Sequence, residues 1–162
     1  MSRDIIVRKY KVAVIQCDSQ NNKGTNLDWI ERCIDEAAGQ NAQMVTMPEN
    51  MNCMGNNIGE GGARSEEIPG YTIRRMQKKA QEHHIYIHCG SIHETCFGES
   101  RSYNTSVLID REGRIIAKYR KLHLFDVTLP DGTDKRESDG ILAGNGIVIV
   151  ETYLGVFGMS IC

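Results

Sequence analysis

The stretch YKVAVIQC (residues 10–17) is a short apolar run that predicts a buried β-strand. A second apolar run, MVTM (residues 44–47), also predicts a strand and is halted by Pro48. Between the two runs, apolar residues recur at the spacing of one helix face: Leu27, Ile30, Ile34 and Ala37. Because a crossover helix joins neighbouring parallel strands, this strand–helix–strand order predicts the start of an α/β layer with parallel strands.

The ends of the helices carry their own signals. Thr25, with Asp28 three residues later, predicts the first turn of the helix as a weak capping box, and Gly39 predicts its end. Pro69 predicts the opening of a second helix. The buried face of that second helix is expected to carry Ile73, Met76 and Ala80.

Downstream of residue 47 the chain alternates between polar and apolar stretches. Residues 50–65 are polar and glycine-rich without periodicity, which predicts a long loop of a kind that often carries function. Apolar runs then predict further strands at residues 85–92, 103–109, 114–120, 146–150 and 154–161. Residues 110–113 predict a hairpin loop, because a glycine ends them. No repeat or linker interrupts the chain, so we expect a single domain over residues 1–162.

Composition argues against several classes of partner. The formal net charge is -2, so no excess positive field favours nucleic acid or anionic lipid, and we expect neither as a partner. Basic residues at helical spacing are interpreted as a solvated helix face: Arg74, Arg75, Lys78 and Lys79. Residues 1–9 are charged without an apolar signal region, and no run reaches transmembrane length, so we expect a cytoplasmic protein. The six scattered cysteines are then expected to be reduced thiols.

Glu49 is the first reactive side chain that follows a predicted strand. In open α/β sheets, sites form just beyond the carboxyl ends of the strands. A partly desolvated carboxylate in that place can act as a general base. The alternative is a solvent-facing glutamate in a turn, and this segment by itself leaves that alternative open.

The segment IIAKYRKLHLFD (residues 115–126) carries the second reactive side chain. In an extended run Lys118 and Arg120 share one face, where they are interpreted as solvated cations. Lys121 and His123 share the other face, and Lys121 sits at the exit of the strand among aromatic and apolar neighbours. We expect Lys121 to be a fixed ammonium that stabilises developing negative charge. His123 is expected to be a structural, hydrogen-bonded histidine, with a catalytic base as the alternative.

The third reactive side chain is Cys162, in GMSIC (residues 158–162). A cysteine just beyond a buried strand can present its sulfur to a cleft while the backbone stays rigid. Its thiol needs an adjacent base or cation to become an effective nucleophile. Taken alone, Cys162 could equally be a small buried apolar side chain.

Taken together, these segments resemble the nitrilase superfamily of carbon–nitrogen hydrolases. The resemblance rests on PEN (residues 48–50), KYRKLHLFD (residues 118–126) and GMSIC (residues 158–162). Three further motifs agree: AVIQ (residues 13–16), IPG (residues 68–70) and YNTS (residues 103–106). Each motif is short, but the set follows the family's order along essentially the whole chain, and KYRKLHLFD is its strongest part.

The resemblance implies an α/β fold whose complete form is a four-layer α-β-β-α sandwich, commonly a homodimer or a larger homo-oligomer. It implies a catalytic triad with Glu49 as general base, Lys121 for oxyanion stabilisation and Cys162 as nucleophile. Many members carry a second glutamate between the lysine and the cysteine, and Glu137 falls at that place, which implies a supporting role. The resemblance implies no metal and no organic cofactor.

The implied reaction is hydrolysis of a small amide to a carboxylate and ammonia through a thioester on Cys162. The motifs are most similar to the branch with Nit-type and ω-amidase enzymes, so a monoamide of a dicarboxylic acid is the expected substrate. Hydrolysis of an N-carbamoyl compound or a nitrile by the same triad is the alternative. Members continue past the cysteine, so we interpret the sequence as the N-terminal part of a longer protein, truncated after its nucleophile.

Two other classes of function remain open. A metal-binding module is suggested by HHIYIHC (residues 83–89), which His93 and Cys96 follow. A strand there would point His88 and Cys89 to opposite faces, which argues against one shared metal site. A non-catalytic scaffold with the family fold is the other alternative, and it would not need the intact set of Glu49, Lys121 and Cys162.

Overall fold

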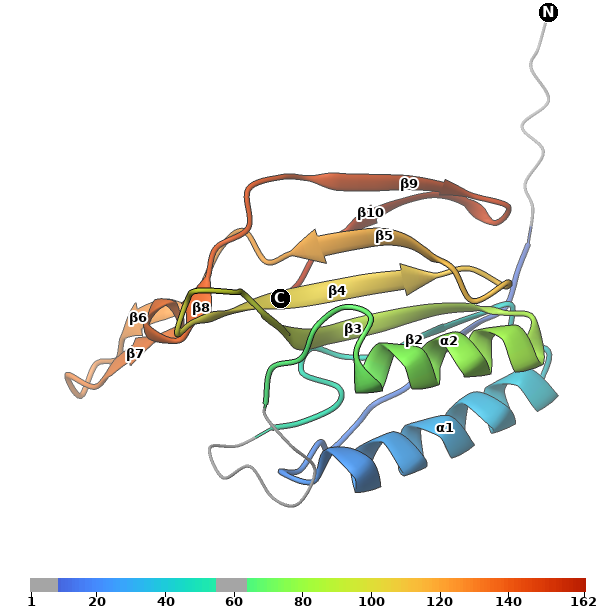
Figure 1. The fold of residues 1–162 in the computed structure, drawn as a ribbon, viewed down its shortest axis with the longest axis horizontal. Helices are drawn as coiled ribbons and strands as arrows, with labels where there is room; N and C mark the ends of the chain where they lie inside the picture. Colours follow the sequence, from blue (N-terminus) through green and yellow to red (C-terminus); the bar gives the residue numbers. More distant parts are fainter. Residues whose placement is uncertain (1–8, 55–63) are drawn as a thin grey trace, which may run out of the picture.

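The computed structural model describes residues 9–54 and 64–162. A six-stranded sheet forms its centre, in the order β1-β2-β3-β4-β5, with β8 paired to β4 (Figure 1). The strands of this sheet are β1 (Val12–Val14), β2 (Met44–Thr46), β3 (Tyr86–Thr95), β4 (Ser102–Ile109), β5 (Ile115–Arg120) and β8 (Ile141–Leu142). The helices α1 (Lys23–Gly39) and α2 (Tyr71–His83) lie side by side on one face of this sheet (Figure 1).

The sheet is parallel on one side and antiparallel on the other. β1 pairs with β2 and β2 with β3 in parallel, which confirms the predicted strand–helix–strand unit. The predicted burial of the first strand is wrong, because β1 is an edge strand and is mostly exposed. β3 pairs with β4 and β4 with β5 in antiparallel fashion. As a result β5 runs in the same direction as β2, and the carboxyl ends of both strands lie at the same edge of the sheet.

The helices pack on the sheet through one apolar core. This core combines the inner faces of both helices with the sheet residues beneath them, such as Leu27, Ile34, Ile73, Met76, Val45 and Ile87. The predicted capping box is wrong, because Asn22 is the N-cap of α1 and its side chain accepts from the backbone N–H of Thr25. The predicted start of the second helix at Pro69 is also shifted, because α2 begins at Tyr71 with Gly70 as its N-cap. The periodicity located both helices, whereas several polar residues near each start could have served as the cap.

A hairpin covers the opposite face of the sheet. It consists of β9 (Val148–Thr152) and β10 (Gly155–Met159), which pair in antiparallel fashion. A second apolar cluster joins Leu154 and Met159 of this region to Met44, Leu108 and Tyr119 of the sheet. The described chain therefore has three layers, of helices, sheet and hairpin (Figure 1).

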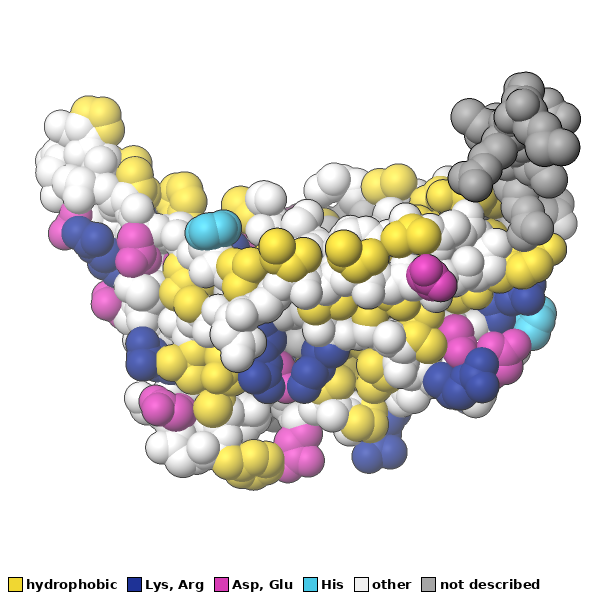
Figure 2. Space-filling model, turned by 90° about the horizontal axis from the view of Figure 1, so that it is seen from above, with side chains coloured by type: hydrophobic (Ala, Val, Ile, Leu, Met, Phe, Trp, Pro, Cys, Tyr) yellow, Lys and Arg dark blue, Asp and Glu magenta, His cyan; other side chains and the backbone are white. Residues whose placement is uncertain are grey.

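The outward side of this hairpin is apolar. Figure 2 shows hydrophobic side chains in a row along this upper side of the molecule. The most exposed of them on the hairpin are Ile147, Ile149, Tyr153 and Val156. The strands predicted at residues 146–150 and 154–161 are thus confirmed, with shifted ends.

Sequence periodicity did not reveal the small hairpin of β6 (Asp126–Thr128) and β7 (Asp134–Arg136). Its residues are mostly exposed, so no apolar alternation marks the strands. The turn between them did carry a signal, because Pro130-Asp131-Gly132 is a typical turn sequence and Gly132 has φ +84°. The hairpin leads into the 3₁₀ helix η1 (Glu137–Asp139). In the described part of the chain, neither helix is long and apolar enough to cross a membrane.

Gly90 on β3 allows a close backbone approach beside the end of β2. A Cβ atom at this position would lie 1.9 Å from the Pro48 carbonyl oxygen and 2.3 Å from that of Met47. The register of β3 against β4 shifts here, between Cys89 and Ile92. The next residue, Ser91, donates its N–H to the Pro48 carbonyl oxygen at 3.2 Å. Gly90 thereby lets β3 hold the segment that leads to Glu49.

We expect Gly90→Ala to lower the free energy of unfolding by about 2 kcal/mol or more, because the added methyl group meets backbone that cannot rotate away. Urea denaturation of wild type and variant at equal protein concentration measures this loss. Gly39→Ala is the matched control, because a Cβ at Gly39 meets nothing within 4 Å. An unchanged midpoint for Gly90→Ala would contradict the close approach.

Candidate active site

Lys121 is a buried cation at the centre of a group of charges at the edge where β2 and β5 end. It directly follows β5, and only 3% of its side chain is exposed. Its Nζ lies 3.0 Å from Oε1 of Glu49 and 2.9 Å from Oε2 of Glu137. Its backbone N–H donates to the Asn104 carbonyl oxygen and its carbonyl accepts from Gly144, so the main chain on both sides is held. A buried ammonium requires such partners, because an unpaired charge in the interior is very costly.

Glu49 reaches this ammonium from the end of β2. The backbone N–H of the following residue, Asn50, donates to Ser91 Oγ at 2.9 Å, and Asn50 adopts a left-handed conformation with φ 55°. The chain therefore turns sharply just after Glu49. Besides the Lys121 ammonium, Oε1 of Glu49 accepts a hydrogen bond from Nδ2 of Asn104 at 2.6 Å. Glu49 lies in a turn just beyond β2 with 30% of its side chain exposed, and its Oε1 is directed to Lys121 and Asn104 rather than to solvent.

Glu137 is the second carboxylate on Lys121. It is the first residue of η1, and its Oε2 accepts the backbone N–H of Phe125 at 2.6 Å. Burial alone would raise the pKa of Glu137, but the Phe125 N–H and the Lys121 ammonium outweigh burial and hold the pKa below its usual range. Burial would likewise lower the pKa of Lys121, but Glu137 and Glu49 outweigh it and raise that pKa. The group therefore holds a charged ammonium between two carboxylates near neutral pH.

Asn104 belongs to this group, although the sequence did not assign it a role. It lies near the start of β4, at the same edge of the sheet, and its Nδ2 faces both Glu49 and Glu137, at 2.6 and 3.4 Å. Its Oδ1 is buried without a hydrogen-bond partner among the residues that the structure describes. The signal available was the YNTS motif, which contains Asn104. Only strand pairing shows that this residue meets residues far away in the chain.

Cys162 lies beyond β10, on the hairpin side of the sheet. Phe157, Met159 and Ile161 alternate toward the apolar cluster beneath the hairpin. Cys162 itself is exposed and has a left-handed backbone with φ 68°. Within the described residues, its thiol makes no hydrogen bond with Glu49 or any other side chain of the charged group. The structure thus brings together Glu49, Lys121 and Glu137, and it leaves Cys162 outside their contacts.

The histidines and cysteines around β3 do not form a shared metal site in the described chain. The imidazole of His88 lies between the hydroxyl groups of Thr46 and Ser106, at 2.7 and 2.8 Å. Cys89 points to the opposite face, into the core under the helices. His93 bonds instead to Ser102. The opposite orientations of neighbouring strand residues therefore separate these ligands, as the strand geometry predicted.

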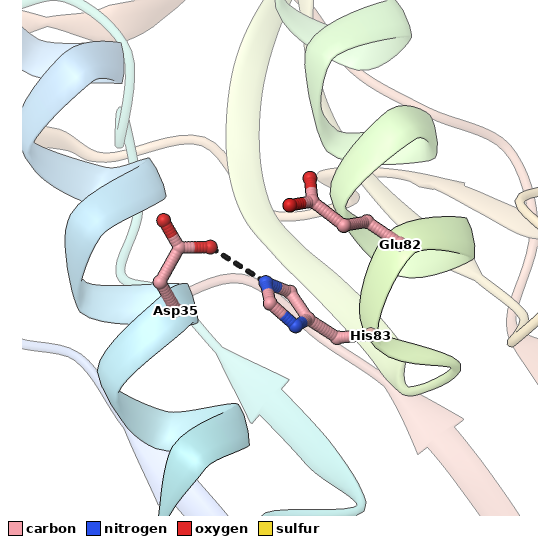
Figure 3. A group of neighbouring side chains, drawn as sticks. All are labelled: Asp35, Glu82 and His83. Carbon is pink, nitrogen blue, oxygen red and sulfur yellow. Dashed lines mark hydrogen bonds and ion pairs between the residues drawn. The ribbon is translucent and has the colours of Figure 1, made fainter.

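Asp35, Glu82 and His83 form a group between α1 and α2 whose ligand atoms lie within 4.8 Å of one another (Figure 3). His83 Nε2 lies 2.6 Å from Asp35 Oδ1. The Lys79 ammonium contacts Asp35 at 2.7 Å and Glu82 at 3.2 Å, so a cation already occupies the space between the two carboxylates. We interpret this group as an ion-pair network that joins the two helices.

Lys118 and Arg120 differ from the solvated cations that the sequence suggested. They share one face of β5, and both bind the buried carboxylate of Glu94, at 2.7 and 2.8 Å. Burial would raise the pKa of Glu94, but the hydrogen bonds from Arg120, Lys118 and Thr105 lower it to about 2. The two cations therefore compensate a buried charge, which the sequence spacing could not show because Glu94 lies on another strand.

Comparisons with known proteins agree with the motifs. The carbon–nitrogen hydrolase family matches residues 11–162. A deaminated glutathione amidase of Synechocystis sp. is 35% identical over 159 residues, which cover 96% of this chain and 58% of the relative. An omega-amidase of Danio rerio is 32% identical over 156 residues, which cover 95% of this chain and 54% of the relative.

A similarity of structure supports the same assignment. The crystal structure of the NitFhit protein of C. elegans matches with a TM-score of 0.82 at 28% identity, over 94% of this chain and 38% of that one. The chain spans about half the length of the curated amidases it matches. The α/β fold of the nitrilase superfamily is therefore confirmed as a partial domain, and the chain belongs to the carbon–nitrogen hydrolase family.

Proposed function

We propose that the protein hydrolyses a small amide to a carboxylate and ammonia through a thioester on Cys162. The observation that carries this proposal is the buried ammonium of Lys121 held by Glu49. The carboxylate that we propose as the general base lies 3.0 Å from the Lys121 ammonium at the edge of the sheet. This arrangement suits acyl transfer, which needs a base for the nucleophile and a positive charge for the oxyanion.

In the proposed reaction, which requires the Cys162 thiol to reach Glu49 in the full-length protein, Glu49 takes the proton of that thiol, and the sulfur attacks the carbonyl carbon of the amide. The carbonyl oxygen gains negative charge, which the Lys121 ammonium stabilises. The proton on Glu49 passes to the leaving nitrogen, the carbon–nitrogen bond breaks, and ammonia departs. Glu49 then takes a proton from water while the water oxygen attacks the thioester carbon, and the thiol is restored as the carboxylic acid leaves.

Glu137 has a supporting role in this proposal. It contacts the ammonium at 2.9 Å, and the Phe125 N–H holds its carboxylate in place. One carboxylate then keeps Lys121 charged and oriented while the other, Glu49, changes its protonation state during the reaction. Asn104 donates hydrogen bonds to both carboxylates. Such support around the reacting groups is what a preorganised site requires.

An amide as substrate is supported by the named relatives. The proteins 35% and 32% identical to this chain are called a deaminated glutathione amidase and an omega-amidase. Both names describe cleavage of an amide bond. We therefore favour a small linear amide over a nitrile or an N-carbamoyl compound.

One prediction of the proposed mechanism concerns the nucleophile and the general base. In the full-length protein, Cys162→Ala should abolish release of ammonia from a small amide, because no thioester can form. Glu49→Gln should lower the turnover rate by roughly two to four orders of magnitude, the usual contribution of a general base. Ammonia release and mass spectrometry of the trapped acyl-enzyme measure these effects.

Cys33→Ala is the matched control for the cysteine, because Cys33 lies on α1 and packs against the core under the helices. It should keep the wild-type rate. Hydrolysis by Cys162→Ala at the wild-type rate would refute the proposed mechanism, whatever the fold of the variant.

A further prediction concerns the contribution of Glu137 to the pH dependence of stability. The folded-state pKa of Glu137 is lowered, so its contribution to stability is present above the unfolded pKa of about 4.3 and is lost as pH falls through the folded pKa. Glu137→Gln should therefore lose less stability than wild type between about pH 5 and pH 3. Denaturant unfolding across this range measures the slope of the free energy of unfolding against pH.

Glu151→Gln is the control for the loss of one carboxylate, because Glu151 is exposed on β9 and has no ion pair in the described chain. Its slope should match that of wild type. A slope for Glu137→Gln as steep as that of wild type would show that Lys121 and Phe125 do not hold the Glu137 carboxylate in its charged form.

A further inference from the structure

The two carboxylates on Lys121 differ in how many hydrogen bonds they accept. Oε1 of Glu137 faces the Lys121 ammonium at 3.2 Å and Nδ2 of Asn104 at 3.4 Å. Oε2 of Glu137 accepts from the Phe125 N–H at 2.6 Å and lies 2.9 Å from the same ammonium. An ionised carboxylate offers about four acceptor sites, so these four contacts leave Glu137 little capacity to accept a further proton.

Glu49 has both of its contacts on one oxygen. Its Oε1 accepts from Nδ2 of Asn104 at 2.6 Å and from the Lys121 ammonium at 3.0 Å. Its Oε2 accepts no hydrogen bond from the part of the chain that the structure describes, and 30% of the Glu49 side chain is exposed. Of the four carboxylate oxygens around Lys121, Oε2 of Glu49 is therefore the one that is open to a reacting group.

The side-chain amide of Asn104 faces these carboxylates in a fixed orientation. Asn104 is 1% exposed on β4, and its backbone carbonyl accepts the N–H of Lys121 at 2.9 Å. Because ionised carboxylates only accept hydrogen bonds, the amide must turn its NH₂ group toward Glu49 and Glu137. Its Oδ1 is then buried without a donor among the described residues. Such an unpaired acceptor costs free energy, so its presence calls for a functional reason.

The charged groups beside Glu49 come from two other segments. They are the Lys121 ammonium beyond β5 and the Glu137 carboxylate at the start of η1. His93 of β3 pairs with Asn104 across the sheet, and its imidazole is neutral at neutral pH because burial lowers its pKa to about 4. Lys121 binds both carboxylates and does not distinguish them. Asn104 does, because its Nδ2 lies 2.6 Å from Glu49 and 3.4 Å from Glu137.

We propose that Asn104 is a positioning residue for the general base, which holds Oε1 of Glu49 and leaves Oε2 to accept the proton. This inference rests on the proposed function and specifies which oxygen of the base reacts. A hydrogen bond to an ionised carboxylate favours its charged form, which is the form that can take a proton. Asn104 therefore acts on the reaction through Glu49.

Asn104→Leu tests this role, because leucine has a similar volume and no N–H donor in its side chain. In the full-length protein with succinamate as substrate, kcat should fall by about tenfold or more, because a charge-assisted hydrogen bond to the base is lost. The KM should stay within about twofold of wild type, because Asn104 is not proposed to touch the substrate. The acid limb of kcat/KM should move to higher pH by about one unit, because the charged form of Glu49 loses a donor.

Thr105→Val is the matched control on the next residue of β4. The Thr105 hydroxyl is also buried and donates to a carboxylate, that of Glu94 at 2.8 Å, on the opposite face of the strand. This variant should keep the acid limb of wild type, whatever its stability. A double-mutant cycle is the second readout. In a Glu49→Gln background, Asn104→Leu should change the residual rate by less than about twofold, because the residue through which it acts is already lost.

The outcomes separate this inference from the proposed function. An unmoved acid limb in Asn104→Leu, or an equal loss of rate with and without Glu49, overturns the positioning role while amide hydrolysis stands. If Asn104→Leu does not fold, Asn104→Ala replaces it, since alanine adds no atom to the site. Failure of both variants to fold makes Asn104 a structural residue and also overturns the proposal.

If wild type does not hydrolyse succinamate, the proposed function fails for this substrate. A ¹³C NMR titration of the Glu49 carboxyl group then decides the role of Asn104 without catalysis, with Glu49→Gln identifying the resonance. A titration midpoint that rises in Asn104→Leu supports the proposal, and an unchanged midpoint overturns it.

Discussion

The ammonium of Lys121 is the constraint on which this edge of the molecule depends. It is almost entirely buried, and burying a charge is tolerated only when partners compensate it. Glu49 and Glu137 supply that compensation from two other segments, 72 and 16 residues away in sequence. The ends of β2 and β5 and the start of η1 must therefore meet at one place before the charge can be accommodated.

The mixed sheet makes this meeting possible. Parallel pairing orders β1, β2 and β3, and two antiparallel steps bring β5 back to the direction of β2. The residues that follow β2 and β5 then emerge at the same edge, and Asn104 enters β4 at that edge from the opposite direction. Gly90 contributes by letting β3 approach the Pro48 carbonyl, so the segment before Glu49 is held by backbone contacts. Placement of the base on strand ends, between packed layers, gives the site its rigidity.

The two groups of charge around β4 and β5 have different consequences. Glu94 is a buried carboxylate that binds both Lys118 and Arg120, so its charge is compensated within the fold and the group is structural. At the neighbouring edge the Lys121 ammonium is shared by two carboxylates, those of Glu49 and Glu137. In the proposed mechanism, one of the two carboxylates on the Lys121 ammonium holds it in place while the other exchanges a proton.

The sequence by itself determined the helices and most strands, because apolar periodicity depends only on local spacing, and its ordered motifs singled out Glu49, Lys121, Glu137 and Cys162. It did not determine the cap at Asn22, the exposed β6–β7 hairpin or the partners of Glu94, since these leave no periodic signal or lie on distant strands. The tertiary structure decided that Lys121 is shared between Glu49 and Glu137, and that Asn104 lies beside them. Such contacts arise from strand direction and long-range pairing, which local sequence patterns do not contain.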